Sequence, residues 1–343
     1  MRAIVFHRHG GLEVLEEADL PTPEPGPGEV RVRVKAVALN HLDLWVRQGL
    51  PSLKLPLPHI LGSDIAGVVD EVGEKVEGVE PGLEVMVQPG LSCMKCQACL
   101  SGHDNDCPSY RIVGEHVRGG YAEYVVVPAS NVVPKPATLS FEEAAAVPLV
   151  FLTAWEMLVR KARLEPGERV LVQAAGSGVS SAAIQIAKLH GAEVIASAST
   201  EEKLRKAREL GADHTVNYTE QDLVTEVRRI VAPKKGVEVV VDHVGEATWD
   251  ASVRALANGG RLVTCGATTG YDVRVDLRHL FYRRLSLLGS TMGSKGDLHR
   301  IVRLIELGKL RPVVDRVLPL SDAREAHRLL AERKAFGKVV LRP

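Results

Sequence analysis

The stretch ERVLVQAAGSGVSSAAIQIAKLHGAEVIASAS, residues 168–199, decides the fold of this chain. It predicts an apolar strand, a glycine-rich turn, a helix over about 179–190 and a second strand. Gly191 stands where a glycine commonly ends a helix. The pattern then repeats, with Thr200 as the N-cap of a charged helix before another short strand. Strands that alternate with helices predict βαβ units and a parallel sheet.

The glycine-rich turn resembles the dinucleotide fingerprint G-x-G-x-x-G, with Ser181 in the last place. The first glycine allows a tight turn, the second lets the backbone approach a pyrophosphate, and the helix N-terminus attracts the phosphates. Such a motif alone is a weak signal, but here a strand precedes it and a helix follows. We therefore expect Gly176, Ser177, Gly178 and Val179 to bind a dinucleotide cofactor.

The residues after the second strand bear on the choice of cofactor. An acidic residue about 20 positions after the fingerprint usually grips the ribose of NAD, and no acid stands at Ala198, Ser199 or Thr200. The hydroxyls of Ser199 and Thr200, with Lys203 and Arg205, could instead receive a 2′-phosphate, although the two cations also fit a solvated helix face. The pattern favours NADP(H) and leaves NAD(H) open.

The first third of the chain is rich in strands. Residues 29–39 alternate valine with arginine and lysine, which is the period of a half-buried strand. Valine-rich segments separated by Gly and Pro follow over residues 64–87 and predict a small rolled sheet.

Four of the five cysteines lie close together in the sequence, at Cys93, Cys96, Cys99 and Cys107. Disulfides are rare in the cytosol, and the last gap of seven residues does not match the three of a ferredoxin-type cluster. The spacing predicts a zinc site. Four thiolates close the coordination sphere, so the zinc would stabilise a loop and not contact substrate.

The composition excludes several classes of function. The chain has 343 residues, enough for two domains, and 43 basic residues balance 43 acidic ones. No net field recruits nucleic acid or anionic membranes. The most apolar stretch, 144–152, contains Pro148 and is too short to span a bilayer, and the first residues do not resemble a signal peptide. We expect a cytoplasmic protein whose partners are small molecules, with no nucleic acid and no membrane.

Taken together, these motifs resemble the medium-chain dehydrogenase/reductase superfamily, which includes zinc alcohol dehydrogenases and quinone oxidoreductases. The resemblance rests on segments in the family's order across nearly the whole chain, namely GGLEVL, PGEVRVRVKAVALNHLD, GSDIAGVVDEVG, the cysteine lobe, the glycine-rich turn, ELGADHTVNY and GKVVL. It implies an α/β fold with two domains. A GroES-like, β-rich catalytic domain would comprise residues 1–147 and 292–343, with the zinc lobe at 90–110. A doubly wound Rossmann NAD(P)-binding domain would comprise 148–291.

The resemblance breaks at the catalytic zinc. Where zinc alcohol dehydrogenases of this family carry their three ligands, this chain has Asn40, Ser63 and, by alignment, Leu149. His41 and His59 lie nearby and are the alternatives as ligands, although a lone histidine is more often a structural residue. The resemblance therefore implies one structural zinc and no catalytic zinc.

The resemblance also implies roles for individual residues. Candidate catalytic residues are Asn40, Asp43 and Thr153; Asn40 would line the substrate pocket or only cap a turn, and Thr153 would lie near the nicotinamide or only bond its own helix. Further cofactor contacts would come from Tyr218, Gly266 and Lys338.

Two more inferences concern Cys265 and assembly. Cys265 is expected to be a small buried residue of a strand and not a nucleophile. The family implies a homodimer or homotetramer, formed through the strand at 284–290.

Without a metal, hydride delivery to a quinone or an α,β-unsaturated carbonyl is the least demanding chemistry, because such acceptors delocalise the incoming charge. The leading hypothesis is an NAD(P)H-dependent oxidoreductase of this kind. The alternatives are an NAD(P)-dependent alcohol dehydrogenase and a non-catalytic NADPH-binding protein.

Overall fold

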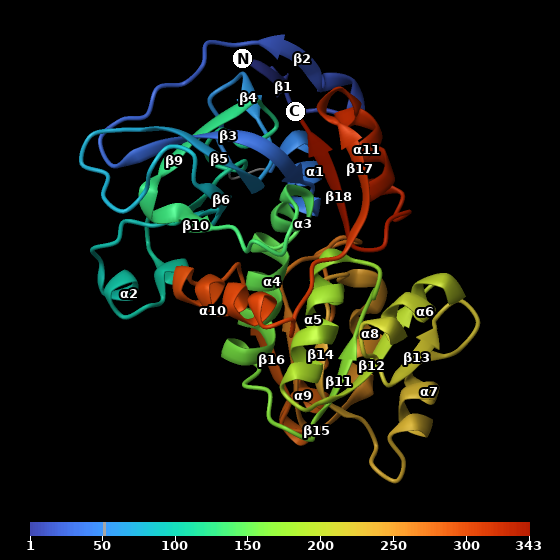
Figure 1. The fold of residues 1–343 in the computed structure, drawn as a ribbon. Coiled ribbons are helices and arrows are strands. Elements are labelled where there is room, and N and C mark those ends of the chain that lie inside the picture. The colour runs from blue at the N-terminus through green and yellow to red at the C-terminus, as the bar shows by residue number, and fades with distance from the viewer. Residues whose placement is uncertain (51–52) are drawn as a thin grey trace. The chain divides into compact units, whose positions relative to one another are not determined.

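The computed structural model describes residues 1–50 and 53–343 (Figure 1). It divides into two compact units, the first comprising Met1–Leu149 with Gly293–Pro343 and the second Val150–Met292. The second unit is therefore an uninterrupted segment, whereas the first is assembled from both ends of the chain.

The first unit is built mainly of strands. Its largest sheet has the strand order β10-β6-β5-β3-β18-β17, with β9 also paired to β3. The strands are β1 (Arg2–Phe6), β2 (Glu16–Asp19), β3 (Glu29–Ala38), β4 (His59–Ile60), β5 (Asp64–Val72), β6 (Glu84–Val87), β7 (Gly90–Leu91), β8 (Arg111–Ile112), β9 (Tyr124–Pro128), β10 (Val132–Pro134), β17 (Val314–Pro319) and β18 (Lys338–Arg342). The helices are α1 (His41–Gln48), α2 (Gln97–Leu100), α3 (Phe141–Ala145), α10 (Lys295–Glu306) and α11 (Ala323–Ala331), and α4 (Pro148–Trp155) begins at the boundary.

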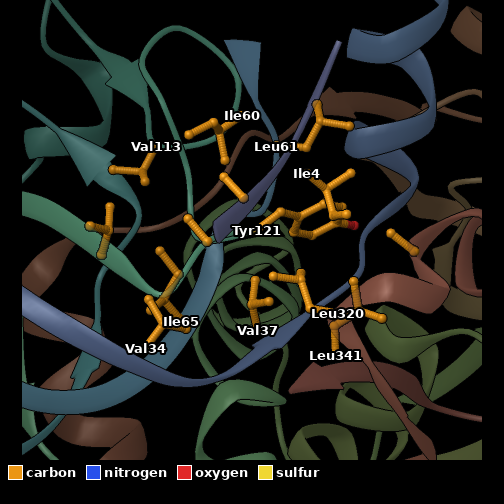
Figure 2. Packing of buried hydrophobic residues seen from close by; sticks show 14 of the residues in the cluster. Ile4, Val34, Val37, Ile60, Leu61, Ile65, Val113, Tyr121, Leu320 and Leu341 are labelled. Carbon is orange, nitrogen blue, oxygen red and sulfur yellow. The ribbon is translucent and has the colours of Figure 1, made fainter. Parts of the chain in front are cut away.

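The central strand β3 explains the packing of this unit. Val30, Val32 and Val34 are buried, and Arg33 and Lys35 of the same strand are exposed, which confirms the predicted alternation. Figure 2 shows the core on the apolar side, where the fully buried ring of Tyr121 lies among aliphatic side chains. The C-terminal strand β18 pairs antiparallel with β3, so the red and blue ends of the chain lie side by side in Figure 1.

The second unit contains a six-stranded sheet in the order β13-β12-β11-β14-β15-β16. Every neighbouring pair is parallel, which confirms the predicted α/β fold class. The strands are β11 (Arg169–Val172), β12 (Glu193–Ala198), β13 (His214–Asn217), β14 (Val237–Val241), β15 (Leu256–Thr264) and β16 (Ser286–Gly289). The helices are α5 (Gly178–Leu189), α6 (Glu201–Glu209), α7 (Leu223–Ile230), α8 (Glu246–Ala255) and α9 (Leu277–Tyr282), and a π-helical turn covers Glu156–Lys161.

The cap of α6 confirms the prediction from the sequence, and a second hydroxyl caps α5. Ser177 caps α5 and Thr200 caps α6, each accepting a hydrogen bond from a backbone N–H three residues later. Gly191 and Gly211, at the ends of these helices, have φ of +77° and +108°, which only glycine adopts without strain. The strand order reverses at β11, which has β12 on one side and β14 on the other, and open α/β sheets bind ligands at such a point.

The apolar stretch around Pro148 forms the end of α3 and much of α4 and is largely buried. Within residues 1–50 and 53–343, no helix has the length and apolar character needed to cross a bilayer.

Candidate functional site

A buried ion pair between Asp64 and Lys338 forms the centre of a polar cluster in the first unit. The Lys338 Nζ lies 2.8 Å from Asp64 Oδ2 and 2.6 Å from Asn40 Oδ1. The Asn40 amide donates to the same Asp64 oxygen at 3.0 Å, and the backbone N–H of Leu149 donates to Asp64 Oδ1 at 2.7 Å. Asn40, Asp64 and Lys338 are 7%, 0% and 3% exposed. We call these three residues the Asp64 cluster.

Pairing of β3 with its neighbours brings the Asp64 cluster together. Ala38, the last residue of β3, faces Asp64 of β5 on one side and Val340 of β18 on the other. Lys338 begins β18, and Asn40 follows β3 as the N-cap of α1. Three separate segments therefore meet at one end of β3.

The donors of the Asp64 cluster are not all used. An ammonium carries three N–H bonds and an amide two; Lys338 uses two of them within the cluster, and Asn40 uses one. One N–H of each therefore remains without an acceptor in the described part of the chain.

The Asp43 carboxylate binds two backbone segments next to the Asp64 cluster. Its carboxylate accepts hydrogen bonds from the backbone N–H of Asn40 at 2.7 Å and of Gly62 at 3.1 Å. Burial raises the pKa of Asp43 to about 6, against the lowering effect of these backbone bonds and of Lys338. Both oxygens are thus engaged with backbone, and a catalytic role for Asp43 stays a prediction.

A row of buried polar side chains continues from Asp43. Burial and the Asp43 carboxylate raise the pKa of Tyr121 well above its usual range. The Tyr121 hydroxyl lies 3.2 Å from His327 Nε2, and Arg47 Nη1 lies 3.1 Å from His327 Nδ1. Because a guanidinium only donates, His327 Nδ1 accepts and the ring proton sits on Nε2. Burial lowers the pKa of His327 to about 3, so this imidazole is neutral.

The residues at the expected catalytic zinc positions do not fit a zinc ion. Leu149 offers no ligand atom, and the amide of Asn40 is bonded to Asp64 and Lys338. The Ser63 hydroxyl is buried and has no hydrogen-bond partner in the described chain. His59 is fully buried with Nε2 3.2 Å from the Gly114 carbonyl oxygen. A zinc would also meet the like charge of the Lys338 ammonium. A catalytic site needs about three protein ligands, which these positions do not supply.

The four predicted cysteines, by contrast, converge. The Sγ atoms of Cys93, Cys96, Cys99 and Cys107 all lie within 4.8 Å of one another, and they form the one set of three or more metal-ligating side chains found among the described residues. Backbone N–H groups of Cys93 and Ser109 point at the Cys107 sulfur from 3.4 Å. These residues fit a closed four-thiolate zinc site, in which the metal would stabilise the surrounding loop.

Lys295, at the start of α10, ties that helix to the cysteine lobe. Its Nζ donates to the Gly90 carbonyl at 2.6 Å, and its backbone N–H donates to Asp104 Oδ1 at 2.9 Å.

The predicted cofactor residues of the second unit gather at the carboxyl ends of its strands. Gly176 and Ser177 lie in the loop between β11 and α5, and Gly178 and Val179 are the first residues of α5. The Ser177 hydroxyl accepts the backbone N–H of Ser180 at 3.0 Å.

The remaining predicted residues of this unit lie on neighbouring segments. Ser199 follows β12 and Lys203 lies in the first turn of α6. Tyr218 follows β13, is 42% exposed, and its backbone N–H bonds the Ala198 carbonyl. Gly266 follows β15, and its carbonyl accepts the Thr264 hydroxyl at 3.0 Å. These positions fit a ligand at the carboxyl edge of the sheet.

Thr153 and Cys265 also belong to the second unit. Thr153 is buried in α4, 4% exposed. Cys265 directly follows β15 and is partly exposed, so the expectation of a buried strand residue was wrong. The packing around its sulfur raises the pKa of the thiol to about 12, so it stays protonated, as expected of a residue that is not a nucleophile.

Sequence reasoning missed several polar residues. Asp64 stands in the GSD segment that aligns with metal ligands. The local pattern that could have revealed it is a single acidic residue at the start of an apolar strand. Tyr121, His327 and His243 carried no motif, because their partners come from distant segments.

A six-stranded parallel sheet with a glycine-rich loop fits a dinucleotide cofactor, and the four clustered cysteines of the β-rich unit fit a structural zinc. The chain belongs to the medium-chain dehydrogenase/reductase superfamily. The family model described as "Alcohol dehydrogenase GroES-like domain" matches residues 26–137, and the one described as "Zinc-binding dehydrogenase" matches residues 178–306.

Relatives point to two substrate classes. A NAD-dependent alcohol dehydrogenase of Saccharolobus solfataricus is 36% identical over 318 residues, covering 90% of this chain and 91% of that protein. Quinone oxidoreductase 1 of Escherichia coli is 32% identical over 355 residues and covers 99% of both. A crystal structure titled as a NAD-dependent alcohol dehydrogenase has 61% identity and a TM-score of 0.97, with both chains fully covered. The chain is thus an NAD(P)-dependent oxidoreductase acting on small molecules.

Proposed function

We propose that this enzyme transfers hydride from NAD(P)H to a quinone or an α,β-unsaturated carbonyl without a catalytic metal. The observation that carries the proposal is the Asp64 cluster, in which a buried lysine–aspartate pair bonds Asn40 and the backbone of Leu149, two of the three positions that align with zinc ligands.

The chemistry follows from where charge develops. Zinc stabilises an alkoxide as a Lewis acid, and no comparable ligand set is present at Asn40, Ser63 and Leu149. When bound, the reduced nicotinamide supplies the hydride. In a conjugated acceptor the resulting negative charge moves to a carbonyl or quinone oxygen, where hydrogen-bond donors stabilise it.

The donors proposed for that oxygen are the remaining N–H groups of Asn40 and Lys338. Asp64 balances the charge of the ammonium and orients both side chains. Thr153 would lie toward the nicotinamide. Asp43 would act by holding the start of α1 and the Gly62–Ser63 segment in place.

The choice between NADP(H) and NAD(H) depends on the end of β12. Ser199 and Thr200 present no carboxylate to repel a 2′-phosphate. The cations Arg205 and Arg208 are each engaged by a glutamate, which weakens the local positive field. We expect NADPH to bind at least as tightly as NADH, although relatives are named NAD-dependent. Dissociation constants for the two cofactors decide this point.

Alcohol dehydrogenase is the second candidate, favoured by the names of the relatives at 36% and 61% identity. It requires alcohol-dependent reduction of NAD(P)⁺, and it would need a group other than a zinc at Asn40, Ser63 and Leu149 to stabilise the alkoxide. A cytoplasmic location and a homodimeric or homotetrameric assembly stay predictions.

The decisive experiment combines elemental analysis with a substrate panel. Protein purified without added metal should contain one zinc per chain and oxidise NADPH with 1,4-naphthoquinone or 2-cyclohexen-1-one. Asn40→Ala should lower kcat, since the donor acts mainly on the developing oxyanion. Two zinc ions per chain with alcohol oxidation as the main activity would overturn the proposal. Tight NADPH binding without turnover would support the non-catalytic alternative instead.

A further inference from the structure

A buried histidine of the second unit lies against the glycine-rich loop. His243 follows β14, and its Nε2 is 2.9 Å from the Ser177 hydroxyl oxygen and 2.9 Å from that of Ser180. One ring nitrogen thus faces two hydroxyls. The direction of each hydrogen bond determines what the loop can offer a ligand.

The Ser180 hydroxyl fixes those directions. Its oxygen lies 2.6 Å from the backbone carbonyl oxygen of Gln173, which can only accept, so the Ser180 hydrogen is donated there. The Ser180 oxygen must then accept from His243, and the ring proton is on Nε2. A protonated nitrogen has no lone pair, so Ser177 cannot donate to it.

The Ser177 hydroxyl hydrogen is consequently left without an acceptor among the described residues. Its oxygen shares the single Nε2 hydrogen of His243 with the Ser180 oxygen and also accepts the backbone N–H of Ser180. Ser177 is also the N-cap of α5, a twelve-residue helix that opens at the predicted phosphate loop. The remaining hydrogen is one that a phosphate oxygen can accept.

Gln173, whose backbone carbonyl accepts the Ser180 hydroxyl hydrogen, is itself held in place by bonds of its side chain. The Gln173 side chain accepts the Ser197 hydroxyl at 2.6 Å and donates to Ser252 Oγ at 2.9 Å. Ser252 donates in turn to Asp242 Oδ2 at 2.6 Å. The residues that follow β11 and β14, the end of β12 and helix α8 are thereby tied together behind the loop.

We propose that His243 is a positioning residue for the dinucleotide: by donating from Nε2, it commits the Ser177 hydroxyl to a phosphate oxygen of the cofactor. With the proton on Nδ1 instead, Ser177 would donate to the ring and turn its lone pairs toward the phosphate. The inference rests on the nicotinamide dinucleotide of the family and is independent of the acceptor proposed above.

The test is direct binding of NADPH, measured by calorimetry without any acceptor substrate. Ser177→Ala should raise Kd about tenfold, as expected for loss of one hydrogen bond to a charged group. His243→Leu should weaken binding by about three- to tenfold in the wild-type background. In the Ser177→Ala background, His243→Leu should raise Kd by less than about a further twofold, because the histidine acts through the Ser177 hydroxyl.

Two variants separate positioning from packing. His243→Gln keeps an N–H donor at a comparable reach and should restore binding to within about twofold of the wild type. His214→Leu is the matched control, since His214 belongs to the same unit but bonds Glu193 on the sheet. It should leave Kd unchanged.

The wild-type protein gives a readout that needs no variant. Nitrogen-15 NMR of labelled histidine should find the His243 proton on Nε2. A proton on Nδ1, or additive losses in the double variant, would overturn the inference. Normal NADPH binding in a chain that reduces neither quinones nor enones would contradict only the proposed function.

Discussion

The Asp64–Lys338 pair is the residue-scale feature with the largest expected energetic consequence. Both side chains are almost fully removed from solvent, and the amide of Asn40 bridges them. A buried pair is weak evidence for net stability, but removing one partner leaves the other charge uncompensated.

Lys338→Met should lower the free energy of unfolding by about 3–5 kcal/mol. Adding Asp64→Asn should recover part of that loss, because no buried charge then remains. Urea denaturation of the two single variants and the double variant measures the coupling. Lys188→Met is the control, since its pair with Asp213 is about a third exposed and should cost under about 1 kcal/mol. Equal losses of unfolding free energy in Lys338→Met and Lys188→Met would contradict the conclusion that removing Lys338 leaves a buried charge uncompensated.

Glu115 gives a pH-dependent prediction. Burial raises the pKa of Glu115 from 4.5 to about 7. A raised pKa means that the stability due to the protonated form is complete below about pH 4.5 and is lost as the pH rises through 7. Glu115→Gln removes the ionisable group, so the free energy of unfolding of the variant should rise relative to that of the wild type between about pH 5 and pH 8. After allowance for partial exposure, the gain at pH 8 should be about 1–2 kcal/mol.

Denaturation curves at several pH values test this difference. Glu123→Gln is the matched control, because hydrogen bonds from Arg2 lower the pKa of Glu123. That variant should lose stability relative to the wild type only as the pH rises toward about 4.5, and the difference should stay constant from pH 5 to pH 8. A flat difference for Glu115→Gln from pH 5 to pH 8 would show that the carboxyl is better solvated than its position indicates.

At the scale of elements, we expect the cysteine lobe to be the segment that depends most on a bound ion. Its helix α2 has four residues and no fully buried one, so it has little apolar surface with which to order itself.

Cys99→Ser should release zinc and lower the unfolding temperature, because three thiolates no longer close the site. Zinc content by elemental analysis and calorimetric melting measure the two effects. Cys265→Ser, outside the lobe, should keep its zinc. Full zinc retention by Cys99→Ser would show that another residue completes the coordination.

Local patterns revealed most elements but few of the polar contacts. Alternation in β3 and the cap at Thr200 are encoded within a few residues, so the sequence predicts them. The partner of Asp64 lies 274 residues away, and no local pattern specifies it. The bonds of His243 depend on β14 lying next to β11, which only the sheet order determines.

At the scale of the whole molecule, the second unit exposes an apolar surface next to an unpaired sheet edge. Strand β16 ends the sheet, and α9, just before it in the chain, exposes Phe281 and Tyr282 at 70% and 79%. Surfaces of this kind mark interaction sites. We expect the predicted assembly of identical chains to use this surface.

Phe281→Glu should therefore shift the protein toward smaller species, since a charge would be buried at the contact. Light scattering coupled to size exclusion measures the mass. Arg278→Glu, on the same helix and 83% exposed at its side chain, controls for a charge that can stay in solvent. An unchanged mass for Phe281→Glu would place the contact elsewhere.

The pairing of β18 with β3 also sets an order of events during synthesis. Asp64 emerges from the ribosome early, whereas Lys338 follows only after every residue of the second unit. The contiguous second unit can fold while the ribosome is still translating. Until β18 has been made, the first unit lacks both the counter-charge of Asp64 and one strand partner of β3, so its early half exposes an unpaired strand edge during that interval.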